Sequence, residues 1–360
     1  MHRESGLTID GQHYEPRELM AFASQKLLQK DLEMWEVSFF SFLKEWYNNA
    51  PVILQNTSGS TGAAKSISLS KQAMRNSAHK TLHFFQLKPQ HTALLSLSAD
   101  YIAGKMMIVR AIEGRLNLLV TAPIGTPAIP NRKINFAAMV PLQVKHLLQH
   151  TGELNNIDIL IIGGAEVDNE LLSGFEQLST KVYATYGMTE TCSHIAVMAL
   201  NGNNREDTYS VMEGVKITLN DRDCIVIHAS HISDKPFITN DIGKITAKGK
   251  FRWLGRADFV INSGAIKVNP EILEQEILKY ISREGYIIPL PDSQLGQKIV
   301  FVVEGIITPS WAEDIRTLLR EKLGAQTSPK AVISLEKFPR TQNMKIDRKR
   351  LISEVLIQNH

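Results

Sequence analysis

The distribution of apolar positions changes along the chain and begins with a helical pattern. Between residues 16 and 48 apolar side chains recur every three to four positions, which predicts one or two amphipathic helices. Residues 71–87 repeat this spacing and predict another helix. Residues 52–54 are a short apolar run followed by a loop rich in Gly, Ser and Thr. This run predicts a short buried strand.

An alternation of apolar runs with helical patterns begins at residue 92. The runs of strand length span residues 92–97, 116–121, 134–140, 157–162 and 181–186. Helical patterns lie between them at residues 142–150 and 170–177. A repeated strand–helix–strand order predicts an α/β fold with a largely parallel sheet.

The pattern changes twice more, near residue 209 and after residue 255. Short strands at 215–219, 224–229 and 244–246 are separated by Asn, Asp and Gly turns, which predicts a mostly antiparallel subdomain. The order beyond residue 255 is helix 270–281, strand 299–303, helix 309–322 and strand 331–335. This pattern is typical of a compact α+β unit. We therefore predict two domains, 1–254 and 255–360, with the boundary at residues 255–258.

Composition narrows the classes of function. The chain has 40 Lys and Arg against 37 Asp and Glu, so its charge gives no reason to expect a nucleic acid or an anionic membrane as partner. It shows no signal peptide and no apolar run long enough to span a bilayer, so we expect no membrane insertion. Two distant cysteines, Cys192 and Cys224, make neither a disulfide framework nor a zinc pattern. A cytoplasmic location is the expectation that follows.

The sharpest chemical feature is a nine-residue loop after the first short strand. Its residues in order are Thr57, Ser58, Gly59, Ser60, Thr61, Gly62, Ala63, Ala64 and Lys65. The glycines let backbone N–H groups approach an anion closely, and Lys65 adds a positive charge for phosphate. A Walker A loop would need Gly in place of Ala64, directly before the Lys. Phosphate binding by another kind of loop is the favoured interpretation, and a solvated linker is the alternative.

A second motif ends the run at 181–186, at a position where open α/β sheets place their ligands. It consists of Tyr186, Gly187, Met188, Thr189 and Glu190. A tyrosine there can stack on a base, a threonine can bond a phosphate oxygen and a glutamate can hold Mg²⁺. The small residues after the neighbouring run at 157–162 predict a tight turn where a flat ring can lie; they are Gly163, Gly164 and Ala165. Cys192 is better interpreted as part of a pocket wall than as a nucleophile, because no base is evident nearby.

Two further segments contribute polar groups. Asp241 can accept hydrogen bonds from both hydroxyls of a ribose, and Arg256 can reach the ribose or an α-phosphate. Ordinary turns are the alternative interpretation of both positions. The segment 339–350 is strongly basic, but its Pro and its apolar residues around Lys345 favour a defined loop over a solvated or nucleic-acid-binding end.

Together and in this order, these motifs resemble those of the adenylate-forming, or AMP-binding, superfamily of acyl-CoA synthetases, peptide-synthetase adenylation domains and luciferases. The resemblance extends from residue 56 to residue 348. It implies an adenylate-forming enzyme fold, in which domain 1–254 binds ATP and the acid and domain 255–360 is mobile. It also implies two half-reactions. A carboxylate and ATP first give an acyl-adenylate and pyrophosphate, and the thiol of coenzyme A then takes the acyl group.

The resemblance assigns a role to each motif. Lys345 would bridge the carboxylate and the α-phosphate, Thr189 would hold the α-phosphate, and Glu190 would hold Mg²⁺. Nucleotide contacts would come from Tyr186, Gly187, Gly163, Gly164 and Ala165 at the adenine, from Asp241 and Arg256 at the ribose, and from Thr57, Ser58, Gly59, Ser60, Thr61, Gly62 and Lys65 at the phosphates. The C-terminal domain would swing about Asp258 and bring the loop at Gly264 towards the thiol.

The chain departs from the superfamily pattern at four positions. Ala64 replaces a usual Pro, and Asn240 and Met344 each replace a usual Gly. Ala265 replaces the second Gly of the loop that lines the path of the thiol, so this change bears most on the thioester step. The chain before the phosphate loop is also shorter than is usual in the superfamily.

The continuation of the second motif to residue 196 resembles that of the o-succinylbenzoate–CoA ligases of menaquinone biosynthesis. This resemblance places Tyr101, Arg110 and His194 at the acid, with Tyr101 in place of the family's His. Arg110 would pair with the second carboxylate of that substrate. Lys105 is a neighbouring candidate, but five residues turn a helix by about 140°, so both cannot easily face one pocket.

Other substrates and outcomes stay open at this point. Another aryl or short acyl acid is the alternative substrate. An enzyme that loads a separate carrier protein and a non-catalytic nucleotide-binding relative are the alternative functions. The presence of Lys65, Glu190, Asp241 and Lys345 favours an enzyme. The sequence does not indicate an oligomeric state, and a homodimer is compatible with it.

Overall fold

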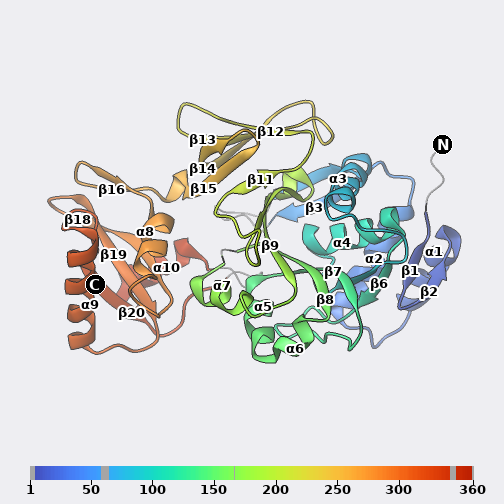
Figure 1. Ribbon diagram of the computed structural model, residues 1–360, viewed down its shortest axis with the longest axis horizontal. Helices are drawn as coiled ribbons and strands as arrows, with labels where there is room; N and C mark the ends of the chain where they lie inside the picture. Colours follow the sequence, from blue (N-terminus) through green and yellow to red (C-terminus); the bar gives the residue numbers. More distant parts are fainter. Residues whose placement is uncertain (1–4, 58–64, 166, 341–345, 359–360) are drawn as a thin grey trace.

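The chain folds around three β-sheets in a computed structural model that describes residues 5–57, 65–165, 167–340 and 346–358 (Figure 1). Among these residues, thirteen strands form one continuous sheet, five form a second sheet and two form a hairpin. Helices pack on the large sheet and on the five-stranded sheet (Figure 1). The predicted α/β class is confirmed.

One half of the large sheet is parallel, as predicted. Its strands are β5 (Thr92–Leu95), β6 (Asn117–Val120), β7 (Ile134–Met139), β8 (Ile157–Ile162) and β9 (Lys181–Gly187). They lie in the order β6-β5-β7-β8-β9, and each neighbouring pair is parallel. An N-terminal hairpin of β1 (Leu7–Ile9) and β2 (Gln12–Tyr14) extends this half beyond β6. The sequence did not reveal this hairpin, because three-residue strands give too little alternation to recognise.

Helices cover both faces of the parallel half. Successive strand residues point to opposite faces, so Leu94 packs in one core cluster and Leu95 in the other. The cluster that contains Leu95 includes buried residues of α1 (Pro16–Lys26), α2 (Met34–Tyr47), α3 (Lys71–Phe84) and α4 (Ile102–Gly114). The cluster that contains Leu94 includes residues of α5 (Pro141–Leu147), α6 (Thr151–Leu154) and α7 (Asn169–Phe175), and the short turn η1 (Leu148–His150) joins α5 to α6.

The other half of the large sheet is antiparallel. Its strands are β10 (His194–Ala199), β11 (Tyr209–Val211), β12 (Val215–Leu219), β13 (Cys224–Ala229), β14 (Phe237–Ala247) and β15 (Lys250–Arg256). They continue from β9 in the order β10-β11-β15-β14-β13-β12, and a short helical turn, η2 (Thr189–Thr191), joins β9 to β10. The predicted antiparallel character is confirmed, although the predicted strand at 244–246 is only part of the longer β14.

The C-terminal segment is a compact α+β unit. Its sheet contains β16 (Ile261–Ser263), β17 (Ile266–Val268), β18 (Gly285–Asp292), β19 (Gly296–Glu304) and β20 (Ala331–Leu335). Its helices are α8 (Pro270–Ile277), α9 (Pro309–Leu323) and α10 (Arg348–Gln358), and η3 (Ala257–Phe259) precedes them. The predicted helix 270–281 was too long, since residues 278–280 form a turn. Strand β18 was missed because it contains Pro289 and Pro291, which are tolerated only because it lies at the sheet edge.

The predicted short strand at 52–54 is longer and less buried than expected. It is β3 (Val52–Thr57), which pairs with β4 (Lys65–Ser70) as an antiparallel hairpin. Side chains alternate along it, so Ile53 is fully buried while Leu54 is 63% exposed. The phosphate-loop candidates Ser58, Gly59, Ser60, Thr61 and Gly62 lie between these strands, outside the described residues.

Along the sequence, the last strand of the large sheet is β15, which ends at Arg256, and the first strand of the five-stranded sheet is β16, which begins at Ile261. The predicted boundary at residues 255–258 falls at this junction, and the division into domains 1–254 and 255–360 stays a prediction. Within the described part of the chain, every helix is too short or too polar to cross a membrane.

Candidate active site

A cavity of about 400 Å³ lies at the carboxyl ends of the parallel strands. Four strands end at its edge, β5, β7, β8 and β9. The residues just beyond them line it, including Ser96, Val140, Gly163 and Gly164. This is the edge of an open α/β sheet at which ligands bind.

Two glycines allow chain segments to approach closely at the cavity. A Cβ on Gly163 would lie 2.4 Å from Thr185 Oγ1, and one on Gly187 would lie 2.4 Å from the Ser193 carbonyl oxygen. Neither position therefore accepts a side chain. The predicted small-residue turn lines the cavity through Gly163 and Gly164, whereas Ala165 is exposed and is not among its lining residues.

A sharp turn after β9 brings the second motif to the cavity. Thr189 lines the cavity, and the half-buried Glu190 follows it in η2. Cys192 has φ +59°, and the N–H of Ser193 donates to the Thr191 carbonyl oxygen at 2.6 Å, which makes a γ-turn. This strained turn directs the next two side chains, Ser193 and His194, into the cavity wall.

Cys192 also lines the cavity, and it is buried. Burial raises the pKa of the Cys192 thiol to about 12, so it is protonated at neutral pH. A protonated thiol is a poor nucleophile. The interpretation of Cys192 as a wall residue is therefore favoured.

Arg110 enters the cavity from α4 and is 2% exposed. Its NH2 group donates to Ser193 Oγ, its NH1 group lies 3.5 Å from the Met107 sulfur, and its Nε has no hydrogen-bond partner among the described residues. None of the described residues that line the cavity is acidic. Burial of this cation lowers the pKa of Arg110 to about 9.

The other two residues predicted at the acid line the same cavity as Arg110. Tyr101 lines the cavity at the N-terminal end of α4, and His194 lines it from the start of β10. Lys105 is not among the lining residues, and its ammonium lies 5.7 Å from the Phe42 ring centre. The expectation from helical geometry that Arg110 and Lys105 do not share a pocket is confirmed.

His194 is held by two hydroxyl groups that sequence reasoning did not assign. Its Nδ1 lies 3.2 Å from Ser193 Oγ, and its Nε2 lies 3.2 Å from Thr81 Oγ1. Burial, and then the charge of Arg110, hold the pKa of His194 well below 6.5, so the ring is neutral. Thr81 lies on α3, and nothing in its local sequence pattern marks it as a site residue.

The residues predicted at the ribose, Asp241 and Arg256, form a connected network with Tyr186, predicted at the adenine, and Asp258, the predicted hinge. The Tyr186 hydroxyl donates to Asp241 Oδ2 at 2.7 Å, and the Tyr186 ring packs edge-on against Phe251. Arg256 lies opposite Asp241 in the strand register, 3.6 Å from its Oδ1, and donates two hydrogen bonds to Asp258 at 2.9 and 3.1 Å. None of these four predicted residues lines the 400 Å³ cavity.

Gly264 lies in the exposed turn between β16 and β17 with φ +63°, and its N–H donates to the Leu295 carbonyl oxygen at 2.8 Å. Ala265, next to it, is also exposed. The structure does not place this turn on the cavity.

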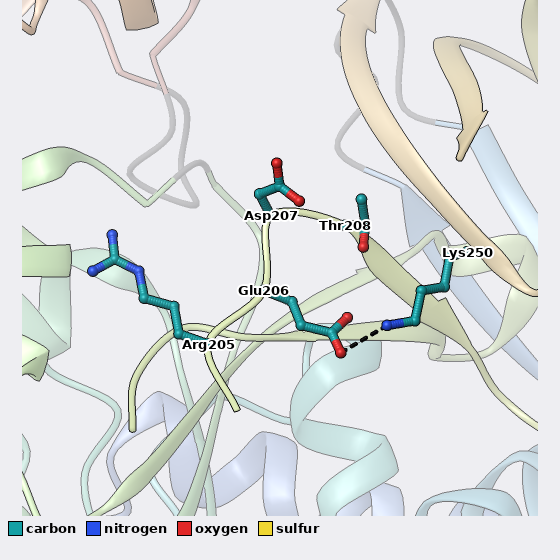
Figure 2. Close-up of a pocket in the computed structure, with 5 residues that line it drawn as sticks. All are labelled: Arg205, Glu206, Asp207, Thr208 and Lys250. Atoms are coloured by element: carbon teal, nitrogen blue, oxygen red, sulfur yellow. Dashed lines mark hydrogen bonds and ion pairs between the residues drawn. The ribbon is translucent and has the colours of Figure 1, made fainter. Parts of the chain in front are cut away.

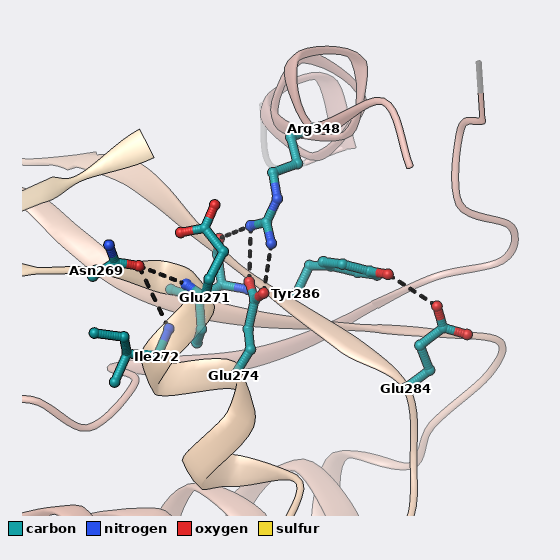
Figure 3. Close-up of polar contacts among 8 residues, drawn as sticks. Asn269, Glu271, Ile272, Glu274, Glu284, Tyr286 and Arg348 are labelled. Atoms are coloured by element: carbon teal, nitrogen blue, oxygen red, sulfur yellow. Dashed lines mark hydrogen bonds and ion pairs between the residues drawn. The ribbon is translucent and has the colours of Figure 1, made fainter. Parts of the chain in front are cut away.

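Lys345 lies outside the described residues, but its flanks are well anchored. Arg340 and Ile346 form an antiparallel bridge, and the N–H of Asp347 donates to the Pro339 carbonyl oxygen at 2.9 Å. Arg348 then donates to both oxygens of the buried Glu274, at 2.8 and 2.5 Å (Figure 3). The described residues on either side of 341–345 are therefore folded, and the expected defined loop around Lys345 stays a prediction.

A second depression lies on the surface beside β11 and β15 (Figure 2). Its lining residues are Arg205, Glu206, Asp207, Thr208 and Lys250. Its charged groups already have partners, since Lys250 pairs with Glu206 at 2.8 Å and Arg205 with Glu176 at 2.9 Å. This depression therefore gives no argument for a ligand.

The described residues of the site could hold a magnesium ion only together with the phosphates of a bound nucleotide. The described part of the chain contains no group of three or more His, Cys, Asp or Glu that could hold a metal. Mg²⁺ is commonly held by one or two carboxylates together with substrate phosphates and water. Glu190, next to Thr189, can supply one such carboxylate.

Comparisons with known proteins agree with this geometry. A sequence model of the family described as AMP-binding enzyme matches residues 10–249. An acyl-CoA synthetase (AMP-forming)/AMP-acid ligase II-like protein from Dyadobacter fermentans is 32% identical, and its structure matches with a TM-score of 0.60 over 92% of this chain and 97% of that chain. The 2-succinylbenzoate–CoA ligase of Lactococcus lactis is 24% identical over 83% of this chain and 70% of its own length.

The o-succinylbenzoate CoA synthetase of Bacillus subtilis, solved with the acyl-adenylate OSB-AMP, shares the fold at a TM-score of 0.76 and 15% identity, over 98% of this chain and 96% of that chain. The resemblance predicted from the motifs is confirmed by the family match, which spans more than half of the chain. The chain belongs to the family of AMP-binding enzymes.

Proposed function

We propose that this chain is an AMP-forming acid–CoA ligase whose acid is o-succinylbenzoate. ATP, carried with Mg²⁺, and coenzyme A are its proposed co-substrates. Family membership supports the adenylation chemistry, and relatives named 2-succinylbenzoate–CoA ligase, such as those of Lactococcus lactis and Haemophilus influenzae, support the acid. The single observation that carries the choice of acid is the buried Arg110, which has no acidic partner among the described residues.

A buried guanidinium that lacks an anion is costly to keep charged. A substrate carboxylate removes this cost, because it accepts two parallel N–H bonds from an Arg. The cavity wall beside Arg110 includes the apolar residues Leu97, Ile102 and Ala138, which suit an aromatic ring. An acid with a ring and two carboxylates therefore fits better than benzoate or a fatty acid.

In the proposed first step, Arg110 holds one carboxylate while the other lies at the Gly163–Thr189 end of the cavity. An oxygen of that carboxylate forms a bond to the α-phosphorus, and the bond from this phosphorus to the pyrophosphate oxygen breaks. Thr189 orients the α-phosphate, Lys345 bridges it to the carboxylate, and Glu190 supplies a ligand for Mg²⁺. The metal would offset phosphate charge when bound. The protein's contribution is positioning and charge stabilisation.

The remaining nucleotide contacts are proposed as the motifs imply. Tyr186 and the turn at Gly163 hold adenine, Asp241 and Arg256 hold the ribose, and the loop between β3 and β4 holds the phosphates. The network from Tyr186 to Asp241 and Arg256 supports this assignment, because it fixes the carboxylate before a ribose arrives.

In the proposed second step, the thiol of coenzyme A attacks the acyl carbonyl. A carbon–sulfur bond forms, AMP leaves with the electrons of the carbon–oxygen bond, and the thiol proton passes to water. Domain 255–360 rotates about Asp258 for this step and brings the turn at Gly264 towards the thiol.

Mass spectrometry of the products tests this function. The protein is incubated with ATP, Mg²⁺ and coenzyme A, and with o-succinylbenzoate, benzoate or a medium-chain fatty acid in separate tubes. We expect o-succinylbenzoyl-CoA with a matching amount of AMP in the first tube and no acyl-CoA in the others. Acyl-CoA from benzoate or the fatty acid, but not from o-succinylbenzoate, would overturn the choice of acid. AMP and pyrophosphate without a CoA product would overturn the thioester step.

A further inference from the structure

A chain of four polar side chains runs from the cavity into the core. It leads from Arg110 on α4 through Ser193 and His194 to Thr81 on α3. The Arg110, Ser193 and His194 side chains line the cavity, whereas Thr81 is fully buried and lies outside it. These hydrogen-bonded side chains therefore link the position of a bound acid to a hydroxyl that no substrate touches.

Donor and acceptor chemistry allows this chain only two directions. An Arg can only donate, so Ser193 Oγ accepts from Arg110. The neutral His194 ring has one N–H and one bare nitrogen, so it donates to one hydroxyl and accepts from the other. If Nδ1 accepts from Ser193, Nε2 donates to Thr81. If Nδ1 donates to Ser193, Nε2 accepts from Thr81.

Without an acid, the first direction gives the Ser193 hydroxyl, the His194 ring and the Thr81 hydroxyl a partner for each proton. Ser193 donates to His194 Nδ1, and the Nε2–H of His194 donates to Thr81 Oγ1. Thr81 then donates to the Ser77 carbonyl oxygen at 3.3 Å. In this arrangement Ser193 has no proton to offer a ligand.

A carboxylate bound at Arg110 favours the second direction of the hydrogen bonds, because a carboxylate only accepts hydrogen bonds. Ser193 is the hydroxyl bonded to Arg110, so it is placed to donate to the same carboxylate. It can do so only if Nδ1 of His194 carries the proton and donates to Ser193 Oγ. Thr81 must then turn its proton from the Ser77 carbonyl oxygen to Nε2.

We infer, on the basis of the proposed function, that binding of the second carboxylate reverses the direction of the hydrogen bonds from Ser193 through His194 to Thr81. The His194 ring then shifts from the Nε2–H to the Nδ1–H tautomer. The ring loses one proton at Nε2 and gains one at Nδ1, by exchange with water of the cavity, so its charge does not change. Thr81 is a positioning residue in this scheme. It supports Ser193 as a second donor to the carboxylate without touching the substrate.

Nitrogen NMR of the histidine rings tests the tautomer directly. A bare ring nitrogen and one that carries a proton have well-separated ¹⁵N shifts, and a His194→Asn variant identifies the His194 signals. We expect a bare Nδ1 in the free protein and a bare Nε2 once o-succinylbenzoate is added. A His194 tautomer that stays the same while calorimetry records binding would overturn the inference and leave the proposed function standing. Absence of binding in calorimetry would overturn the proposed function, and this inference with it.

Kinetics of Thr81 variants add a second test. Thr81→Val keeps the shape but removes the hydroxyl, and we expect it to raise the KM for o-succinylbenzoate about tenfold, as for a lost bond to a charged group, with kcat and the KM for ATP unchanged. Thr81→Ser should restore the wild-type KM. Thr180→Val is the matched control, since it removes another buried hydroxyl, which bonds the Leu154 carbonyl oxygen at 2.7 Å. Equal effects of Thr81→Val and Thr180→Val, or a loss in kcat alone, would contradict the role of Thr81.

Discussion

Two largely buried arginines occupy very different surroundings in this molecule. Arg348, with a side chain 13% exposed, donates to both oxygens of Glu274 and lies over the rings of Tyr286 and Phe259, 5.0 and 5.4 Å from their centres. Arg110, 2% exposed, has a serine hydroxyl and a methionine sulfur as its partners, and its Nε has none among the described residues. Burial opposes the charge of both, but the carboxylate of Glu274 raises the pKa of Arg348, while burial alone lowers that of Arg110 to about 9.

This difference separates a structural charge from a functional one. Arg348 is complete within the fold, and it ties the chain just after the loop of Lys345 to α8 and to η3, which contains Phe259. Arg110 has no carboxylate partner in the part of the chain that the structure describes, and it faces a cavity large enough for a ligand. A fold that keeps such a cation uncompensated gives up stability for binding.

Breaking the ion pair between Arg348 and Glu274 should have the largest effect on stability. Glu274→Gln removes the carboxylate that bonds the buried Arg348 and leaves it only the more distant charge of Glu271, so we expect the free energy of unfolding to fall by about 3 kcal/mol. Urea denaturation measures this change. The control is Glu276→Gln on the same helix, where the exposed pair with Lys279 should contribute less than about 1 kcal/mol. Losses of the same size in both variants would remove the contrast between a buried and an exposed pair.

Removing the charge of Arg110 should weaken substrate binding rather than stability. Arg110→Met deletes a buried cation but keeps most of its volume, so we expect no loss in the free energy of unfolding. The kcat/KM for o-succinylbenzoate should fall about 100-fold, because the substrate carboxylate is then left without its partner. A variant that loses stability but keeps its kcat/KM would assign Arg110 to the structure rather than to the substrate.

The smallest expected effect is a dependence of stability on pH. Arg110 has a folded-state pKa of about 9, below its unfolded value, so the unfolded chain binds more protons above that pH. The penalty for burying the charge is therefore complete below pH 9 and is relieved as the pH rises. Between pH 8 and pH 10 the wild type should gain about 1 kcal/mol of unfolding free energy relative to Arg110→Met. A constant difference between the two proteins would show that Arg110 stays charged over this range.

The sequence predicted the class of the fold and the neighbourhood of Arg110 well, for identifiable reasons. Strands β5 to β9 are short apolar runs, and helical patterns at residues 142–150 and 170–177 separate the last three of them, which is a strong periodic signal. The glycine turn and the second motif follow β8 and β9 directly. That Arg110 and Lys105 do not share the cavity follows from the turn of one helix, whereas the choice of Arg110 rested on the family resemblance.

Long-range contacts could not be predicted in the same way. The pairing of Arg348 with Glu274 joins residues 74 positions apart, and that of Thr81 with His194 joins residues 113 positions apart. Neither pair has a spacing that a helix or strand would make meaningful. Strand β18 escaped prediction because its prolines contradict the strand rule except at a sheet edge.

The most direct test of the account compares two acids that differ only in the second carboxylate. These are o-succinylbenzoate and 4-oxo-4-phenylbutanoate, which lacks the carboxylate on the ring. We would measure kcat/KM for each with the wild type and with Arg110→Met. We expect the wild type to prefer o-succinylbenzoate by about 100-fold and the variant to show no preference. An undiminished preference in Arg110→Met would contradict the claim that Arg110 recognises the second carboxylate.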